Sequence, residues 1–178
     1  MTTTKKNWPR SCLQIYTGHG KGKTTAALGL ALRAAGTGLR VYFGQFLKSR
    51  DCGEVAALER FAGEITLERF GSGQWAHKGD AGEIALAQRG IEQVRAALLS
   101  GAYDLVVCDE ILGALRLELL TLGQVLELAR ERPVQTELVF TGRDAPEELV
   151  QAADLVTEMR EIKHYYATGL PARWGIEH

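Results

Sequence analysis

A glycine-rich stretch near the start of the chain has the composition of a phosphate-binding loop. An apolar run precedes it and an alanine-rich helical pattern follows it, which is the strand–turn–helix context that such a loop requires. Backbone N–H groups of the turn and the positive end of the helix dipole would converge on anionic oxygens. We expect the phosphates of a nucleoside triphosphate to be held by Gly18, His19, Gly20, Lys21, Gly22, Lys23, Thr24 and Thr25.

Within this loop two side chains have distinct expected tasks. Lys23 would reach the terminal phosphates, and the Thr24 hydroxyl would ligate a magnesium ion. Thr17 stands where the pattern G-x-x-x-x-G-K-[ST] has its first glycine, and Gly18 follows one place later. A flexible glycine loop before a helix is the alternative, and the matching flanks favour the nucleotide site.

An acidic pair, Asp109-Glu110, follows the apolar run Leu105–Cys108 directly. A carboxylate at this position holds magnesium beside the loop threonine, so we predict a metal site formed by Thr24, Asp109 and Glu110. In an ATPase the second carboxylate could instead polarise a water. Acidic residues also favour helix N-termini, which is the purely structural alternative.

The sequence is less informative about the roles of the other charged residues and the histidines. Arg143 follows a strand-like run and could clamp a phosphate with its planar fork, although a surface arginine fits the same pattern. Arg33, near the end of the helix after the loop, could likewise bind a phosphate or be an ordinary surface arginine. His77 and His164 lack metal-ligand spacing, so no zinc site is expected. Because no protein nucleophile is evident, the attacking atom is expected to belong to a substrate.

Apolar, β-rich runs alternate with helical patterns along the whole chain. This order predicts an α/β fold with a mostly parallel central sheet and helices on both faces. The predicted strands are Cys12–Tyr16, Arg40–Phe46, Ile65–Phe70, Leu105–Cys108, Glu137–Thr141 and Leu155–Glu158. The predicted helices are Thr24–Ala35, Gly53–Ala62, Gly82–Leu99, Thr121–Arg130 and Pro146–Ala152.

Size and composition limit the class of protein. The 178 residues predict one domain over residues 12–178, after a flexible segment over residues 1–11. A net charge of −1 with interspersed signs offers no footprint for nucleic acid. No signal peptide or membrane span is visible, and three cysteines without a C-x-x-C pair suit a reducing compartment. We therefore expect a cytoplasmic protein that binds neither membrane nor nucleic acid.

Two stretches lack clear periodicity and are expected to serve a second substrate. One is the glycine-rich loop Gly71–Gly82, which contains Trp75, and the other is the aromatic and basic tail Lys163–His178. Irregular loops in a compact domain are disproportionately functional. A loop anchor in the core is the structural alternative for Trp75.

Taken together, five motifs resemble the P-loop type of ATP:corrinoid adenosyltransferase. The similarity runs from about Leu13 to the C-terminus and implies a three-layer P-loop NTPase (RecA-like) fold. The motifs are Gly18–Thr25, Gln45–Lys48, Val107–Glu110, Thr141–Arg143, and Lys163-His164 with Gly175-Ile176.

The resemblance also implies a reaction. The Co(I) centre of a reduced corrinoid attacks the 5′ carbon of ATP and releases triphosphate, with ATP reversed in the loop relative to ordinary NTPases. It further implies Mg²⁺ (or Mn²⁺), a flavoprotein reductant and a homodimer. The implied catalytic residues are Lys23, Thr24, Glu110 and Arg143, and both Arg33 and Arg143 would assist the loop in holding the phosphates.

By position, Trp75 matches a family tryptophan that faces the corrinoid and helps to displace its lower axial ligand. The family phenylalanine two residues earlier is Gly73 here, so either Phe70, the nearest aromatic, substitutes for it or the displacement of the axial ligand is weaker or differently built. His19 stands where the family loop has asparagine.

Two other functions remain open at this point. One is a P-loop ATPase or small-molecule kinase that forms ADP, and the other is a nucleotide-dependent corrinoid carrier or regulatory module. The motifs do not distinguish among natural corrinoids.

Overall fold

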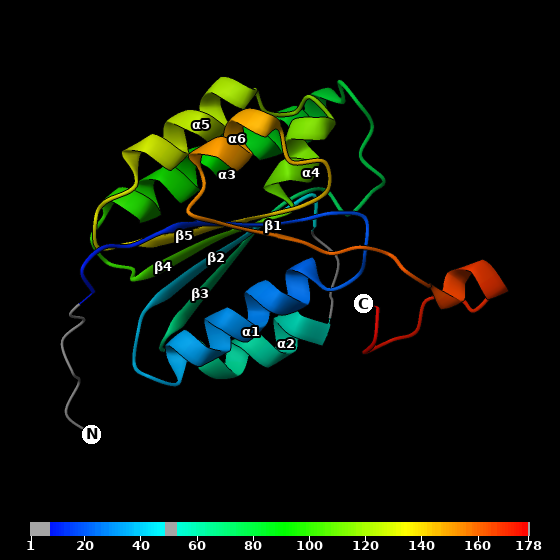
Figure 1. Ribbon diagram of the computed structural model, residues 1–178, viewed down its shortest axis with the longest axis horizontal. Coiled ribbons are helices and arrows are strands. Elements are labelled where there is room, and N and C mark those ends of the chain that lie inside the picture. The colour runs from blue at the N-terminus through cyan, green and yellow to red at the C-terminus, as the bar shows by residue number, and fades with distance from the viewer. Residues whose placement is uncertain (1–7, 49–52, 178) are drawn as a thin grey trace.

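The computed structural model describes residues 8–48 and 53–177 of the chain. Within these ranges one six-stranded sheet forms the centre of the molecule, and every strand pairing in it is parallel. The strand order is β3-β2-β4-β5-β1-β6 (Figure 1). The strands are β1 (Leu13–Thr17), β2 (Val41–Phe46), β3 (Ile65–Phe70), β4 (Leu105–Asp109), β5 (Glu137–Thr141) and β6 (Leu155–Glu158).

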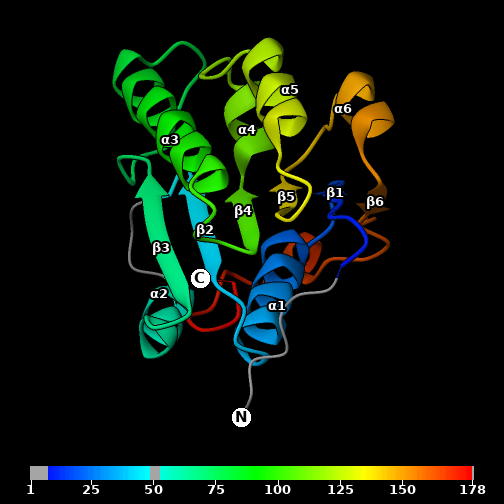
Figure 2. The same cartoon turned by 90° about the vertical axis from the view of Figure 1, so that its left-hand side faces the viewer.

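Helices cover both faces of this sheet (Figures 1 and 2). On one face lie α1 (Lys23–Ala35) and α2 (Gly53–Leu58). On the other face lie α3 (Ala81–Leu99), α4 (Ile111–Arg116), α5 (Leu122–Glu131) and α6 (Glu147–Ala152). Among the described residues, no helix is both long enough and apolar enough to cross a bilayer.

The core has two halves because successive residues of a strand point to opposite faces of the sheet. In β4, Val107 packs in the half that contains Ala27 of α1, whereas Val106 and Cys108 pack in the half that contains Val94 of α3. All five side chains are buried. The continuous apolar run of β4 is therefore explained by burial on both faces.

Parallel pairing brings the carboxyl ends of all six strands to one edge of the sheet. The glycine loop leaves β1 at this edge, Glu110 follows β4, and Arg143 follows β5. Ligands of open α/β sheets bind at the carboxyl edge, so the topology places the candidate residues where a site is expected.

The predicted α/β architecture is confirmed, and the sheet is wholly rather than mostly parallel. Two helical regions differ from expectation. The pattern over Gly53–Ala62 forms α2 only as far as Leu58 and continues as a 3-10 turn, Glu59–Phe61. The short α4 was not expected, because four of its six residues are buried and no helical alternation is visible.

The N-terminal segment is described only in part. Residues 1–7 of the segment 1–11, which we expect to be flexible, lie outside the described residues. Ser11 is buried, and its backbone N–H donates to the Val134 carbonyl at 2.8 Å. The start of β1 is therefore tied to the turn before β5.

Candidate active site

The glycine loop between β1 and α1 has a backbone that side chains would disturb. Gly18 and Gly22 have φ values of 95° and 120°, which L residues rarely adopt. A Cβ on Gly18 or Gly20 would lie 2.5 or 2.7 Å from the Met159 carbonyl oxygen. The Gly20 N–H donates to that same oxygen at 2.7 Å. The loop is thus packed against the segment that follows β6, and glycine is required at these positions.

Lys23 points into this loop. Its side chain is buried, and its Nζ donates to the carbonyl oxygens of Gly18 at 2.7 Å and Gly20 at 2.8 Å. Burial lowers the pKa of the Lys23 ammonium below its usual value. A cation within a glycine-rich loop at the start of a helix is the arrangement that receives a polyphosphate.

Asp109 is the hub of a polar cluster beneath the loop and is fully buried. Its Oδ1 accepts hydrogen bonds from the hydroxyls of Thr24 at 2.9 Å and Thr141 at 2.7 Å. Its Oδ2 accepts from Lys48 Nζ at 3.0 Å and from Gln45 Nε2 at 3.3 Å. Burial alone would lower the pKa of Lys48, but Asp109 raises it above its usual value. The cluster joins the ends of β2, β4 and β5 to the first turn of α1.

Glu110 has a strained backbone, with a φ of 59°, at the point where the chain turns from β4 into α4. Its N–H donates to the Thr141 hydroxyl at 2.9 Å. A Cβ at Gly113 would lie 2.9 Å from Glu110 Oε2, so glycine leaves room for the carboxylate. Burial, and then the neighbouring Asp109, raise the pKa of Glu110. Strain of this kind is found mostly at functional sites.

The loop after β5 brings Arg143 to the pocket. Gly142 has a φ of 140°, and a Cβ there would lie 2.6 Å from Leu112 Cβ, so the chain passes close to α4. Asp144, the residue after Arg143, pairs through Oδ1 with His19 Nε2 at 3.2 Å. The unusual histidine of the glycine loop therefore contacts the β5–α6 loop.

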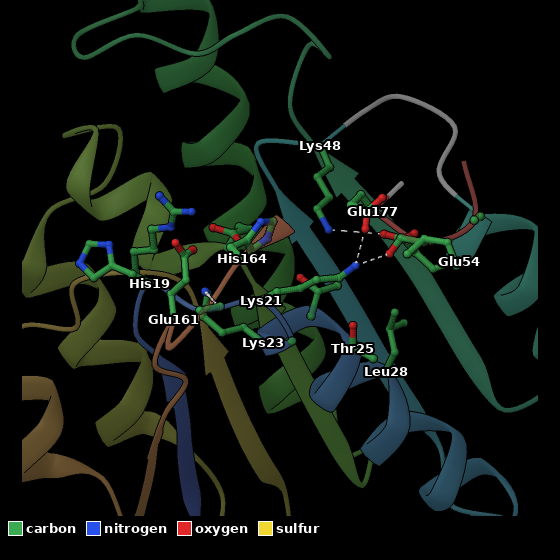
Figure 3. Close-up of a pocket in the computed structure, with 18 residues that line it drawn as sticks. His19, Lys21, Lys23, Thr25, Leu28, Lys48, Glu54, Glu161, His164 and Glu177 are labelled. Atoms are coloured by element: carbon green, nitrogen blue, oxygen red, sulfur yellow. Dashed lines mark hydrogen bonds and ion pairs between the residues drawn. The ribbon is translucent and has the colours of Figure 1, made fainter. Parts of the chain in front are cut away.

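These elements surround a pocket of about 580 Å³ (Figure 3). Most of the predicted phosphate-binding residues line it, together with Glu110 and Arg143. The lining residues are His19, Gly20, Lys21, Gly22, Lys23, Thr24, Thr25, Leu28, Lys48, Gly53, Glu54, Glu110, Arg143, Glu161, His164, Gly175, Ile176 and Glu177.

Five predicted residues are not among those that line this pocket: Gly18, Asp109, Arg33, Phe70 and Trp75. Asp109 is fully buried. Arg33 lies in the last turn of α1, about 15 Å along the helix from Lys23 at 1.5 Å per residue. Phe70 is 3% exposed and packs against Phe46 with ring centroids 5.4 Å apart, so the structure places it in the core rather than at a surface. Trp75 is 87% exposed, and so it is not the loop anchor that its residue type alone suggested.

Sequence reasoning assigned no individual role to the charged residues Lys48, Glu54 and Glu161, which line the pocket. Lys48 Nζ lies between Asp109 Oδ2 at 3.0 Å and Glu54 Oε1 at 3.4 Å. Lys48 belongs to the motif Gln45–Lys48, and the first and last residues of this motif both donate to Asp109 Oδ2. The C-terminal tail was expected to serve a second substrate, but five of its residues or near neighbours line the same pocket as the glycine loop.

The oxygen donors of the pocket suit a hard divalent cation. Thr24 and Glu110 line the pocket, and Oδ1 of the buried Asp109 lies 2.9 Å from Thr24 Oγ1. No group of three or more His, Cys, Asp or Glu side chains in the described ranges could hold a metal alone. A hydroxyl and one or two carboxylates leave positions for phosphate oxygens, which is how Mg²⁺ is bound with nucleotides.

Comparison with known proteins identifies the family. The model of the family ATP:corrinoid adenosyltransferase BtuR/CobO/CobP matches residues 9–178. A corrinoid adenosyltransferase of Pseudomonas aeruginosa is 36% identical over 170 residues, which cover 94% of this chain and 84% of that protein. One of a Sinorhizobium species is 35% identical over 167 residues, covering 92% and 78%. The corrinoid adenosyltransferase CobA of Salmonella typhimurium is 32% identical over 170 residues, covering 95% and 86%. With the glycine loop, the acidic pair and Arg143 all inside the matched range, the chain belongs to the ATP:corrinoid adenosyltransferase family.

Proposed function

We propose that the pocket binds the triphosphate of ATP and that the enzyme transfers the 5′-deoxyadenosyl group to the Co(I) centre of a reduced corrinoid. The cobalt attacks C5′ of the ribose, a Co–C bond forms, and the bond from C5′ to the phosphate oxygen breaks. The electron pair of that bond leaves with the triphosphate. Adenosylation of a corrinoid is a step of adenosylcobalamin biosynthesis or salvage.

The observation that carries this proposal is the position of Lys23. Its buried ammonium is held at 2.7 and 2.8 Å by two loop carbonyls, and the next residue, Thr24, contacts the buried Asp109. Loop N–H groups and this ammonium would neutralise charge that grows on the departing triphosphate, with Arg143 at the pocket edge. The same groups would bind ATP before reaction.

The described residues that line the pocket include no evident activated nucleophile, which supports a nucleophile from the second substrate. Among the described residues that line it there is no cysteine or serine, and the Thr24 hydroxyl already donates to Asp109. We propose that ATP lies reversed relative to ordinary NTPases, so that C5′ turns toward the corrinoid. Holding the two reactants in line then supplies most of the catalysis.

We propose that Thr24, Asp109 and Glu110 hold a Mg²⁺ (or Mn²⁺) ion. Such an ion would add positive charge beside the triphosphate when bound. The adjacent oxygens of Thr24 and Asp109 support this assignment.

We further propose that a reduced flavoprotein supplies the electron that generates Co(I) and that two copies of the chain associate. Family resemblance supports both. Large apolar side chains at the surface, Trp75 at 87% and Ile162 at 95% exposed, are compatible with contacts to a partner or a corrinoid.

An anaerobic assay with MgATP and chemically reduced Co(I) corrinoid tests the proposal. We expect a light-sensitive Co–C product and an equal amount of triphosphate. Formation of ADP and phosphate with an unchanged corrinoid spectrum would contradict it and would indicate a P-loop phosphotransferase. Binding of both ligands without any product would indicate a carrier.

A further inference from the structure

Lys21 belongs to the glycine loop, but its ammonium is directed away from the loop interior. Its Nζ donates to the Ile176 carbonyl at 2.7 Å, to Glu177 Oε1 at 3.0 Å and to the Tyr165 hydroxyl at 3.2 Å. Figure 3 shows Lys21 extending toward Glu177, whereas Lys23 lies along the loop. All three partners of Lys21 belong to the C-terminal tail, more than 140 residues away in the sequence.

Glu177 gathers the tail around the same contact. Its carboxylate accepts from the Arg173 backbone N–H at 2.7 Å, from Arg173 Nη2 at 3.2 Å and from the Tyr165 hydroxyl. Only 14% of its side chain is exposed, although it lies next to the last residue of the chain. These donors hold the pKa of the Glu177 carboxyl well below its usual range. The carboxylate thus closes the tail on itself and on the glycine loop together.

Apolar burial does not hold this tail in place. From Lys163 to Glu177 no residue is buried, and Tyr166, Trp174 and Ile176 are 76%, 70% and 55% exposed. Segments with few buried apolar contacts open at low free-energy cost. Among the described residues, the contacts of Lys21 with Tyr165, Ile176 and Glu177 therefore form a direct polar link between the tail and the glycine loop.

The part of the tail that Lys21 contacts also lines the pocket. His164, Gly175, Ile176 and Glu177 form one side of the pocket whose other side is the glycine loop. When the tail is docked, it walls the pocket, and when the tail is released, that wall is missing.

We propose that Lys21 and Glu177 form a clasp that docks the C-terminal tail on the glycine loop as a wall of the nucleotide pocket. Lys21 is then a positioning residue for the tail rather than a phosphate ligand. The wall's role in catalysis rests on the proposed function, since it assumes that the pocket binds ATP, whereas docking itself does not.

Hydrogen–deuterium exchange on the nucleotide-free, full-length protein tests the clasp. Glu177→Gln removes the charge with little change of shape, Lys21→Met removes the donor, and Lys21→Arg retains one. We expect the first two to speed exchange in residues 163–177 about fivefold or more, and Lys21→Arg to stay near the wild type. The matched control is Glu127→Gln. Glu127 lies on α5 and pairs with Arg95 of α3, so its replacement should leave exchange in the tail unchanged.

Steady-state kinetics with Co(I) corrinoid supply the second measurement. Loss of the wall should raise KM for ATP about fivefold in both Glu177→Gln and Lys21→Met, with a smaller change in kcat. Unchanged tail exchange in both variants overturns the clasp. A higher KM in Lys21→Met alone, with Glu177→Gln like the wild type, also overturns it and assigns Lys21 to the phosphates. Failure of the proposed function would appear separately, as an unchanged KM for ATP in Lys23→Ala, while exchange would still decide the clasp.

Discussion

Two lysines of one loop, Lys21 and Lys23, have opposite surroundings. Lys23 is 7% exposed and is held by loop carbonyls, whereas the Lys21 side chain is 41% exposed and is paired with Glu177. Their spacing in the sequence predicts phosphate binding for both. Residue type and spacing do not reveal the direction of a side chain, because the tail that attracts Lys21 is remote in the sequence.

Replacing Lys23 with alanine should cause the largest loss of activity. The variant removes the cation that would face the leaving triphosphate, and we expect kcat/KM to fall about a hundredfold to a thousandfold. Triphosphate formation under anaerobic conditions is the measurement. Lys21→Met is the matched control within the same loop and should lose far less. Equal losses in the two variants would contradict the different roles assigned to them.

The pair of Asp109 and Lys48 predicts a coupling in stability. Asp109→Asn leaves the Lys48 ammonium, only 25% exposed, beside a neutral amide, and should lower the free energy of unfolding by about 2–3 kcal/mol. Adding Lys48→Met removes the unpaired charge and should return at least ~1 kcal/mol of that loss. Urea denaturation of the two single variants and the double variant measures the coupling. Strictly additive losses would show that the two charges do not interact.

At the scale of elements, the strands were predictable and the short connections were not. All six predicted strands occur with ends shifted by one residue at most, because β-rich apolar runs between helical patterns leave little choice. The helix α4 escaped prediction because it is only six residues long and because the residue before it, Glu110, has a left-handed backbone conformation. The sequence also could not show whether Phe70 lies in the core or at the surface. As the last residue of a strand it is compatible with either the core or a surface, and packing against Gly90 and Phe46 decides for the core.

An element-scale prediction concerns Asp154, which joins the start of β6 to β1. Its Oδ2 accepts the Leu13 N–H at 2.8 Å and pairs with Arg132 at 3.3 Å. The Leu13 N–H first, and then Arg132 and Arg10, outweigh desolvation and lower the pKa of Asp154 below its usual 3.8. Because the folded-state pKa is the lower one, the unfolded chain binds the proton more readily. The stabilisation is therefore present above pH 3.8 and is lost as the pH falls through the folded-state pKa.

Asp154→Asn should consequently lower the free energy of unfolding at neutral pH by about 1–2 kcal/mol. The difference from the wild type should shrink as the pH falls below 3.8. Urea denaturation from neutral to acid pH provides the measurement. Glu92→Gln, at a carboxylate that is 64% exposed, should change stability by less than ~0.5 kcal/mol throughout. A difference that is independent of pH would assign the effect of Asp154 to packing alone.

For the whole molecule, the parallel sheet places two candidate regions on one edge. The glycine loop follows β1, and the loop that carries Trp75 follows β3, so both leave the carboxyl ends of their strands. β2, β4 and β5 lie between β3 and β1, and Lys48, Glu110 and Arg143 follow those strands in the same order. A nucleotide in the pocket and a corrinoid against Trp75 would thus meet along a single edge.

Trp75 is where this arrangement can be tested as a whole. With 87% of its surface exposed, the indole adds little to the fold, so Trp75→Ala should change the free energy of unfolding by less than ~0.5 kcal/mol. KM for ATP should also stay unchanged, because Trp75 does not line the nucleotide pocket. Corrinoid binding should weaken by about tenfold, as expected when an exposed aromatic anchor is truncated. Val134→Ala, at a 65% exposed residue on the turn before β5 and thus at the opposite edge, is the control and should alter neither substrate. A parallel loss for ATP and corrinoid would mean that the two regions are not separate, whereas a loss confined to the corrinoid would place the second substrate on the loop between β3 and α3.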